Sequence, residues 1–234
     1  MKPFLIIQND AQEGAGYLQV LINQRGSLTC TYPGWEANYT HLTTDAFCAL
    51  IVLGGAQSVY ETDKYSYLID EIQLVKDFIN SGKPVIGLCL GAQILATALG
   101  GEVKANTQKE IGWFEIQLSE HAKTDDVMNE HPQTAMAYHF HGDFFKLPPD
   151  CVSLAKSELT ECQLFRYKQN VYGFQYHAEV DLALIEVMCL SNADYMKTNG
   201  YDVKDVIAES KKQFIEYNNR CETLLNKWID KAKL

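Results

Sequence analysis

The segment from Pro84 to Gly101 constrains the fold of this chain more than any other part of the sequence. It reads PVIGLCLGAQILATALGG, so a short β-forming run meets a G-x-C-x-G motif, a helix-forming run follows, and two glycines end it. This order predicts a strand, a sharp turn and a helix, with Cys89 in the turn. Gly87 and Gly91 suit such a turn because the backbone is crowded there and glycine has no side chain. The pattern is the cysteine counterpart of the G-x-S-x-G nucleophile elbow.

Cys89 in this position differs chemically from an ordinary buried cysteine. The helix that follows directs its amino end at the thiol, and its dipole and free N–H groups favour the reactive thiolate. The N–H group of Leu90 is placed to hold a developing oxyanion. An isolated G-x-C-x-G motif is more often a small buried cysteine between packing glycines. Here the strand before and the helix after favour a nucleophile.

The first half of the chain alternates between strand-like and helix-like patterns. Such alternation predicts a parallel sheet covered by helices on both faces, with ligands bound beyond the carboxyl ends of the strands. We therefore expect the chemistry in the loops after Leu53 and Ile86. The expected strands are 4–7, 28–32, 49–53 and 84–86, and the expected helices before the elbow are 14–24 and 67–79.

The second half reads as a smaller antiparallel element followed by helices. Residues 1–234 are expected to form one domain, with a C-terminal helical extension over about 200–234. That extension has an apolar face, so we expect it to pack on its own domain, although docking to a partner chain is the alternative. The expected strands are 113–118, 134–140, 151–155, 163–167 and 171–175, the expected helices are 182–190 and 203–234, and the apolar face comprises Val206, Ile207, Phe214, Leu224, Leu225 and Trp228.

A cysteine nucleophile needs a proton-handling partner, usually a histidine that a third group orients. His177 is the best of the six histidines because it follows the strand-like run 171–176. Glu179 lies two residues later, where its carboxylate can reach the imidazole and fix its tautomer. Taken alone, His177 would be a core histidine and Glu179 a solvated carboxylate at a helix start. Together with Cys89, a catalytic constellation is the better interpretation.

Composition excludes several classes of protein. The 234 residues are 47% hydrophobic and 21% charged, as in an ordinary soluble domain, and the formal net charge of -10 disfavours a nucleic-acid partner. No apolar run is long enough for a bilayer, and the N-terminus lacks the features of a signal peptide, so we expect a cytoplasmic protein without a membrane partner. The 7 cysteines include no C-x-x-C pair. Most of the other six should be small buried residues: Cys30, Cys48, Cys151, Cys162, Cys189 and Cys221.

The remaining histidines give little sign of a metal site. His139 and His141 form an H-x-H pattern that could place two ligands on one face of a strand. No third ligand is evident in the sequence, so we expect no metal. His41, His121 and His131 have no informative context and are expected at the surface.

These motifs together resemble the class I glutamine amidotransferases. Residues 87–93 match the family's G-x-C-x-G-x-Q elbow, and residues 174–179 match its Q-x-H-x-E block. Residues 53–60 resemble its glycine loop, and residues 141–143 resemble part of the S-H-G-D segment of the amidotransferase domain of GMP synthetase. The resemblance implies an α/β, flavodoxin-like three-layer sandwich with a mostly parallel central sheet, plus the smaller antiparallel element and the C-terminal helix.

The resemblance also implies roles for individual residues, without a cofactor. Cys89 would attack the side-chain amide of glutamine, His177 would protonate the leaving ammonia and then activate water, and Glu179 would orient His177. The oxyanion hole would comprise the N–H groups of Gly55 and Leu90, and the substrate-binding residues would be Gln93, His141 and Asp143.

Two departures from the family pattern affect the substrate site. Ala56 replaces a proline that is frequent in the glycine loop, and Phe140 replaces the serine expected before His141. Taken alone, the glycine loop and the segment 141–143 are equally compatible with simple turns.

Three functions are compatible with these observations. The first is a glutaminase that releases ammonia and glutamate, with the ammonia passing to a separate synthetase, since no ATP-binding motif follows Glu179. The second is a stand-alone γ-glutamyl peptidase or hydrolase that uses the same three catalytic residues. Phe140 in place of the serine would fit a changed substrate pocket in such an enzyme. The third is a non-catalytic binding protein, which the complete set of three residues disfavours.

Overall fold

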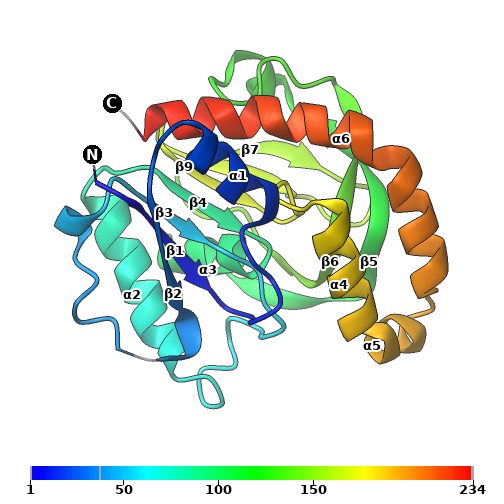
Figure 1. Cartoon of the computed structure of the whole chain (residues 1–234), viewed down its shortest axis with the longest axis horizontal. Coiled ribbons are helices and arrows are strands. Elements are labelled where there is room, and N and C mark those ends of the chain that lie inside the picture. The colour runs from blue at the N-terminus through cyan, green and yellow to red at the C-terminus, as the bar shows by residue number, and fades with distance from the viewer. Residues whose placement is uncertain (1, 37, 233–234) are drawn as a thin grey trace.

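The computed structural model describes residues 2–36 and 38–232, and within them nine strands form one sheet (Figure 1). The strand order is β2-β1-β3-β4-β9-β8-β7-β5-β6. The strands are β1 (Phe4–Gln8), β2 (Thr29–Pro33), β3 (Ala49–Val52), β4 (Val85–Leu88), β5 (Val103–Leu118), β6 (Thr134–Phe145), β7 (Cys151–Lys156), β8 (Leu164–Tyr167) and β9 (Val171–Phe174). The α-helices are α1 (Gly16–Gln24), α2 (Tyr67–Asn80), α3 (Leu90–Ala98), α4 (Leu182–Ser191), α5 (Ala193–Thr198) and α6 (Val203–Lys231).

The sheet has a parallel half and an antiparallel half. Strands β2, β1, β3, β4 and β9 pair in parallel, whereas β8, β7, β5 and β6 continue the same sheet through antiparallel pairings. The α/β class is confirmed. The expectation of a mostly parallel sheet is not, because the antiparallel strands extend the central sheet and supply as many pairings in the described strands as the parallel ones.

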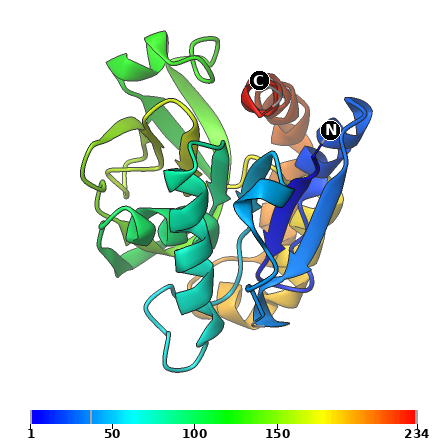
Figure 2. The same cartoon turned by 90° about the vertical axis from the view of Figure 1, so that its left-hand side faces the viewer.

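Helices cover both faces of the parallel half. On β1, Phe4 and Ile6 belong to one core and Leu5 and Ile7 to the other, as the two-residue period of a strand requires. The first core includes side chains of α1, α4 and α6, and the second includes side chains of α2 and α3. Figure 2, in which α6 is seen along its axis, shows this helix lying against the sheet. The parallel half is therefore a helix–sheet–helix sandwich.

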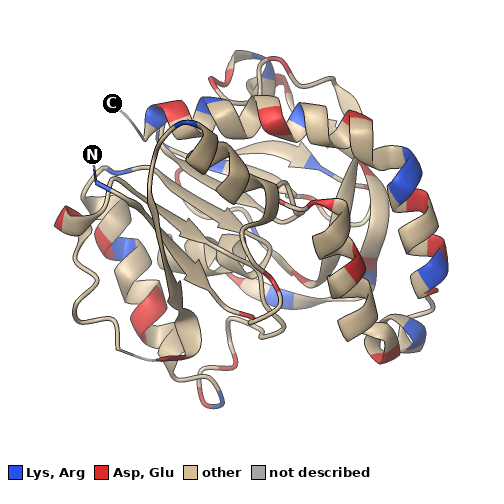
Figure 3. Cartoon of the chain, viewed as in Figure 1, with Lys and Arg blue, Asp and Glu red and all other residues tan. Residues whose placement is uncertain are grey.

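Helix α6 packs its apolar face on the rest of the chain. Leu224, Leu225 and Trp228 are buried in the first core, and the indole N–H of Trp113 donates to Ser210 Oγ at 2.8 Å. Figure 3 shows basic residues of α6 interspersed with acidic ones in this view, while the parallel strands carry little charge. None of the described helices is long and apolar enough to traverse a bilayer.

Two strands extend well beyond their expected bounds, whereas several other elements differ by only one or two residues. Strand β5 begins at Val103, ten residues before the expected Trp113. The sequence did not predict this extension because residues 104–109 are mostly polar and exposed and lack apolar alternation. Strand β6 likewise extends to Phe145. The short helix α5 was not expected, because six residues give too few turns for a periodic pattern.

Candidate active site

Cys89 lies at the turn between β4 and α3, as the sequence predicts. Its φ of 53° and ψ of -109° place a non-glycine residue in a conformation that costs free energy, which is typical of functional turns. The neighbouring glycines are required by close backbone contacts. A Cβ atom on Gly91 would lie 2.0 Å from the Val52 carbonyl oxygen, and one on Gly87 would lie 2.4 Å from that of Gly91. The β3–β4–α3 packing thus fixes where the thiol stands.

Strand β9 brings His177 to Cys89 from far along the sequence. Leu88 pairs with Phe174, and the Cys89 N–H donates to the Phe174 carbonyl at 2.8 Å. The chain then reaches His177, whose N–H donates to the Tyr138 carbonyl at 2.9 Å and whose carbonyl accepts from the Tyr217 hydroxyl at 2.5 Å. Contacts from β6 and α6 therefore hold the backbone of His177 on both sides.

The imidazole of His177 is paired with Glu179. Its Nδ1 lies 2.7 Å from Glu179 Oε1, and both side chains are buried. Burial alone would lower the pKa of His177, but the Glu179 carboxylate and the Cys89 side chain outweigh it and raise the pKa well above its ordinary value. The other ring nitrogen, Nε2, is buried without a hydrogen-bond partner among the described residues at ordinary donor–acceptor distances. This arrangement favours a protonated imidazole that can interact with a thiolate at Cys89.

The Cys89 sulfur has few other partners. It lies 3.7 Å from the Phe140 carbonyl oxygen and 3.9 Å from Gln175 Nε2, and the residue is 6% exposed. That small exposure faces a cavity of about 350 Å³, which Cys89 lines together with Gly55 and Leu90. The structure therefore brings both expected oxyanion-hole residues to the cavity of the thiol.

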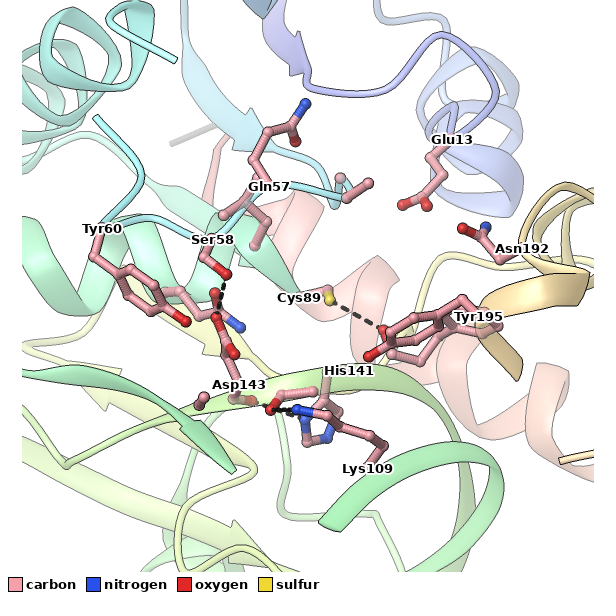
Figure 4. Close-up of a pocket in the computed structure, with 17 residues that line it drawn as sticks. Glu13, Gln57, Ser58, Tyr60, Cys89, Lys109, His141, Asp143, Asn192 and Tyr195 are labelled. Carbon is pink, nitrogen blue, oxygen red and sulfur yellow. Dashed lines mark hydrogen bonds between the residues drawn. The ribbon is translucent and has the colours of Figure 1, made fainter. Parts of the chain in front are cut away.

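The cavity has two sides, with Cys89 between them (Figure 4). On one side, Ser58 Oγ donates to Asp143 Oδ2 at 2.7 Å, and Lys109 Nζ donates to the Gly142 carbonyl at 2.9 Å. On the other side lie Glu13 and Asn192, and the Tyr195 hydroxyl lies close to Gly142 and Lys109. All three residues expected to bind substrate, Gln93, His141 and Asp143, line this cavity. Lys109 and Glu13 also line it, and no motif in the sequence singled them out.

Buried polar residues support the wall of the cavity at His141. The His141 Nδ1–H donates to the Asp143 carbonyl at 2.9 Å, and Nε2 lies 3.3 Å from Glu110 Oε2. Burial lowers the pKa of His141, against the opposing effect of Glu110. His139 lies next to His141, with 3.4 Å between Nδ1 of His139 and Nε2 of His141.

Glu110 is the third potential metal ligand that the sequence did not reveal. Among the described residues, Glu110, His139 and His141 form a buried group of the kind that can hold a metal ion. The structure therefore supplies a third potential ligand for the H-x-H pair, and the expectation of no metal stays a prediction. The Glu110 carboxylate, however, already accepts hydrogen bonds from Ser157 and Thr160 at 2.6 Å and from Gln163 at 2.8 Å. These donors satisfy the oxygen atoms of the buried carboxyl group.

The other cysteines and histidines lie outside the cavity or deep in the fold. His41 and His121 are exposed and His131 is half-buried. Three of the six remaining cysteines are buried, namely Cys162, Cys189 and Cys221, and two are half-buried, Cys48 and Cys151. Cys30 differs from the expected buried cysteine because it is exposed. Cys30 lies on the edge strand β2, where none of the five residues is fully buried.

The chain is similar to known proteins over most of its length. The sequence model of the family "Glutamine amidotransferase class-I" matches residues 12–193. A glutamine amidotransferase-like protein of Acanthamoeba polyphaga mimivirus is 29% identical over 185 residues, which cover 78% of this chain and 81% of that protein. One subunit of the glutamine-hydrolysing GMP synthase of Methanospirillum hungatei is 30% identical over 135 residues, which cover 57% of this chain and 65% of that protein.

Other relatives are larger, and the solved structures agree in fold. The glutamine-hydrolysing GMP synthase of Spiroplasma kunkelii is 28% identical over 76% of this chain, but the match spans only 34% of that enzyme. The crystal structure of a glutamine amidotransferase from Methylobacillus flagellatus superposes with a TM-score of 0.91 at 23% identity, covering 99% of this chain and 95% of the other. A glutamine amidotransferase from Thermotoga maritima gives a TM-score of 0.88, also at 23% identity, covering 99% and 97% of the two chains. The chain therefore belongs to the class I glutamine amidotransferase family.

Proposed function

We propose that this protein hydrolyses the side-chain amide of glutamine through a thioester on Cys89 and releases ammonia and glutamate. One observation carries the proposal: a strained cysteine at the elbow lines the cavity, and its Cβ atom and Cε1 of the buried His177, which is paired at 2.7 Å with Glu179, both lie close to Gly54. The raised pKa of His177 supports an imidazolium–thiolate pair, the reactive state of cysteine nucleophiles.

The proposed reaction has two half-reactions. The Cys89 thiolate attacks the δ-carbon of glutamine, and the N–H groups of Gly55 and Leu90 hold the oxyanion. As the C–N bond breaks, His177 gives its proton to the nitrogen, and ammonia leaves from a γ-glutamyl thioester. His177 then takes a proton from water, the hydroxide attacks the thioester carbon, and the C–S bond breaks to release glutamate. Glu179 keeps the imidazole oriented and stabilises its charge.

The wall opposite Glu13 suits the amino-acid end of glutamine. Asp143 offers a carboxylate for the α-ammonium group, and Lys109 offers an ammonium group for the α-carboxylate. Gln93 is 3% exposed, and its Nε2 donates to Gln175 Oε1 at 3.3 Å. It therefore contributes an ordered amide group to the cavity. These opposite charges complement a zwitterionic substrate.

A further part of the proposal concerns the acceptor of the ammonia. The similarity to a GMP synthase subunit of Methanospirillum hungatei supports transfer of ammonia to a separate synthetase chain, and we propose that the transfer takes place in the cytoplasm. A γ-glutamyl peptidase or hydrolase is the second candidate. It is favoured by the side of the cavity that contains Glu13 and Asn192, which ammonia as a leaving group does not need.

A glutamine-mimicking electrophile tests the site directly. Incubation of the purified protein with it, followed by peptide mass mapping, should place the label on Cys89. The exposed Cys30 serves as an internal control for non-specific alkylation. Equal labelling of both cysteines, or protection of neither by glutamine, would contradict the proposal. Parallel assays with glutamine and γ-glutamyl peptides then separate the two candidate activities.

The proposed chemistry requires no metal ion. Glutamine hydrolysis should persist after prolonged treatment with a chelator, and metal analysis of the purified protein should give much less than one equivalent. A stoichiometric metal ion whose removal abolishes turnover would instead assign a catalytic role to the cluster of Glu110, His139 and His141.

A further inference from the structure

We propose that Glu13 binds a positively charged group in the leaving part of the substrate, so that the protein acts on γ-glutamyl amides of amines that carry a second cationic group. This inference rests on the proposed Cys89 chemistry and specifies the substrate class of its γ-glutamyl hydrolase form.

Glu13 lies on the side of the sulfur from which the leaving group departs. A Cβ atom built on Gly54 would lie 2.7 Å from Glu13 Oε2, 3.2 Å from His177 Cε1 and 3.5 Å from Cys89 Cβ. The carboxylate, the imidazole and the nucleophile therefore surround one small space. Since His177 must protonate the departing nitrogen, that nitrogen and the atoms attached to it leave past Glu13.

The carboxylate of Glu13 has no partner of its own. No hydrogen bond or ion pair with a described residue holds it, although the residue is half-buried and its side chain points into the cavity (Figure 4). Burial raises the pKa of Glu13 to about 7, with the charge of His177 acting in the opposite direction and Asp10 adding to the rise. Enclosed carboxylates are normally paired, and a ligand cation would satisfy this one.

Glu13 also borders a second cavity, which is lined by acidic and neutral groups. Glu13 and Asn192 line both this cavity, of about 170 Å³, and the larger one, and Asp10 lines the second. Among the described residues that line the second cavity there is no lysine or arginine. An anionic leaving group would be repelled there, whereas an ammonium group would be attracted.

The wall next to Glu13 suits an aliphatic chain. Phe140 and Tyr195 both line the cavity, and their rings lie 6.5 Å apart between centroids. Ammonia, the leaving group of glutamine, is too small to reach this wall and the second cavity together. A leaving amine with a short hydrocarbon chain and a terminal ammonium group would contact both the wall and the acidic residues.

Three γ-glutamyl amides of similar length test the inference. Their leaving amines are 1,4-diaminobutane, which leaves a cationic end, pentylamine, which is neutral, and 4-aminobutanoate, which is anionic. We expect kcat/KM to be about 10-fold or more higher for the cationic amide than for the neutral one, and lower again for the anionic one. An equal or reversed order in the wild-type protein would overturn the inference, as would turnover of glutamine far above that of all three amides.

Variants assign the preference to Glu13. Glu13→Gln should reduce the ratio of cationic to neutral turnover to near one, whereas Glu13→Asp should retain part of it. Asp63→Asn, which removes an exposed carboxylate outside the cavity, is the matched control and should leave the ratio unchanged. A preference that persists in Glu13→Gln would overturn the role of this residue.

Failure of this inference can be distinguished from failure of the proposed function. If Cys89 is labelled by the electrophile and glutamine or the neutral amide is hydrolysed without a charge preference, only the leaving-group site is wrong. If no label appears on Cys89 and no γ-glutamyl amide is hydrolysed, both proposals fail together.

Discussion

The two halves of the sheet contribute different parts of the candidate site. In the parallel half, β4 and β9 pair in continuous register, every residue of both strands is buried, and their ends carry Cys89 and His177. In the antiparallel half, β5 and β6 contain both buried and more exposed residues and provide Lys109, His141 and Asp143. The difference suggests that the reacting groups are fixed by the core, whereas the groups around the substrate stand on a partly exposed hairpin.

An irregularity in the hairpin explains how Lys109 reaches the cavity. Ala105 pairs with Asp143 and Glu110 pairs with His141, so residues 106–109 lie opposite the single residue Gly142. Such bulges redirect side chains and are frequent beside active sites. Here the bulge places the Lys109 ammonium group against the Gly142 carbonyl at 2.9 Å, over the cavity.

The largest effect is expected at the nucleophile in the parallel half. Cys89→Ala removes the atom that forms the thioester, so kcat/KM for the preferred substrate should fall by roughly 10⁵-fold or more. Thermal unfolding and circular dichroism should remain close to those of the wild type, because alanine fits the space of the cysteine. Residual turnover near the wild-type level would locate the chemistry elsewhere.

A smaller but still large effect is expected at Glu179. Glu179→Gln preserves the shape but removes the charge that raises the pKa of His177 and orients its ring. By analogy with amide substitutions in other triads, kcat should fall about 10³–10⁴-fold with little change in KM. A change confined to KM would show that Glu179 acts in binding. It would contradict the assignment of the reacting groups to the parallel half and of the substrate-binding groups to the antiparallel half.

The sequence was informative where local rules and burial agree. The strand–turn–helix at Cys89 could be predicted because glycine spacing, a β-forming run and a helix-forming run all indicate the same backbone. His177 followed because a buried strand precedes it. Glu13 and Lys109 could not be predicted, because their importance arises from pairings between distant segments and from a register irregularity, neither of which leaves a local pattern. The same limit applies to Glu110, whose partners at 157, 160 and 163 lie in the connection between β7 and β8.

Substitutions on the hairpin should affect binding more than chemistry. Lys109→Met removes a charge proposed to hold the α-carboxylate while keeping the length of the side chain. We expect KM for the γ-glutamyl substrate to rise about 10–100-fold, with kcat within a few-fold of the wild type. Asp143→Asn should behave similarly towards the α-ammonium group. A substrate analogue without the corresponding charge should lose this sensitivity, and an equal loss of kcat in both variants would contradict the comparison.

The smallest effect concerns stability and contrasts a buried glutamate in each half. Glu71 on α2 accepts one hydrogen bond, from Asn9 at 2.9 Å, and its Oε2 has no partner among the described residues. Burial raises the pKa of Glu71 to about 8, against the lowering effect of Asn9. Because the folded pKa exceeds the unfolded value, this residue costs stability as the pH rises from about 4.5 to about 8, and the cost is constant above that window.

Glu71→Gln should remove this pH dependence while retaining the acceptor for Asn9. At pH 7 we expect the free energy of unfolding to increase by about 2–3 kcal/mol relative to the wild type, with no gain at pH 4.5. Glu110→Gln is the matched contrast, because a Gln amide group would face the donors of Ser157, Thr160 and Gln163. That variant should lose about 1–3 kcal/mol at pH 7. Denaturant titrations of both variants at the two pH values would measure this contrast. If the free energy of unfolding changed in the same direction in both variants, the two halves of the sheet would stabilise their buried carboxyl groups in the same way.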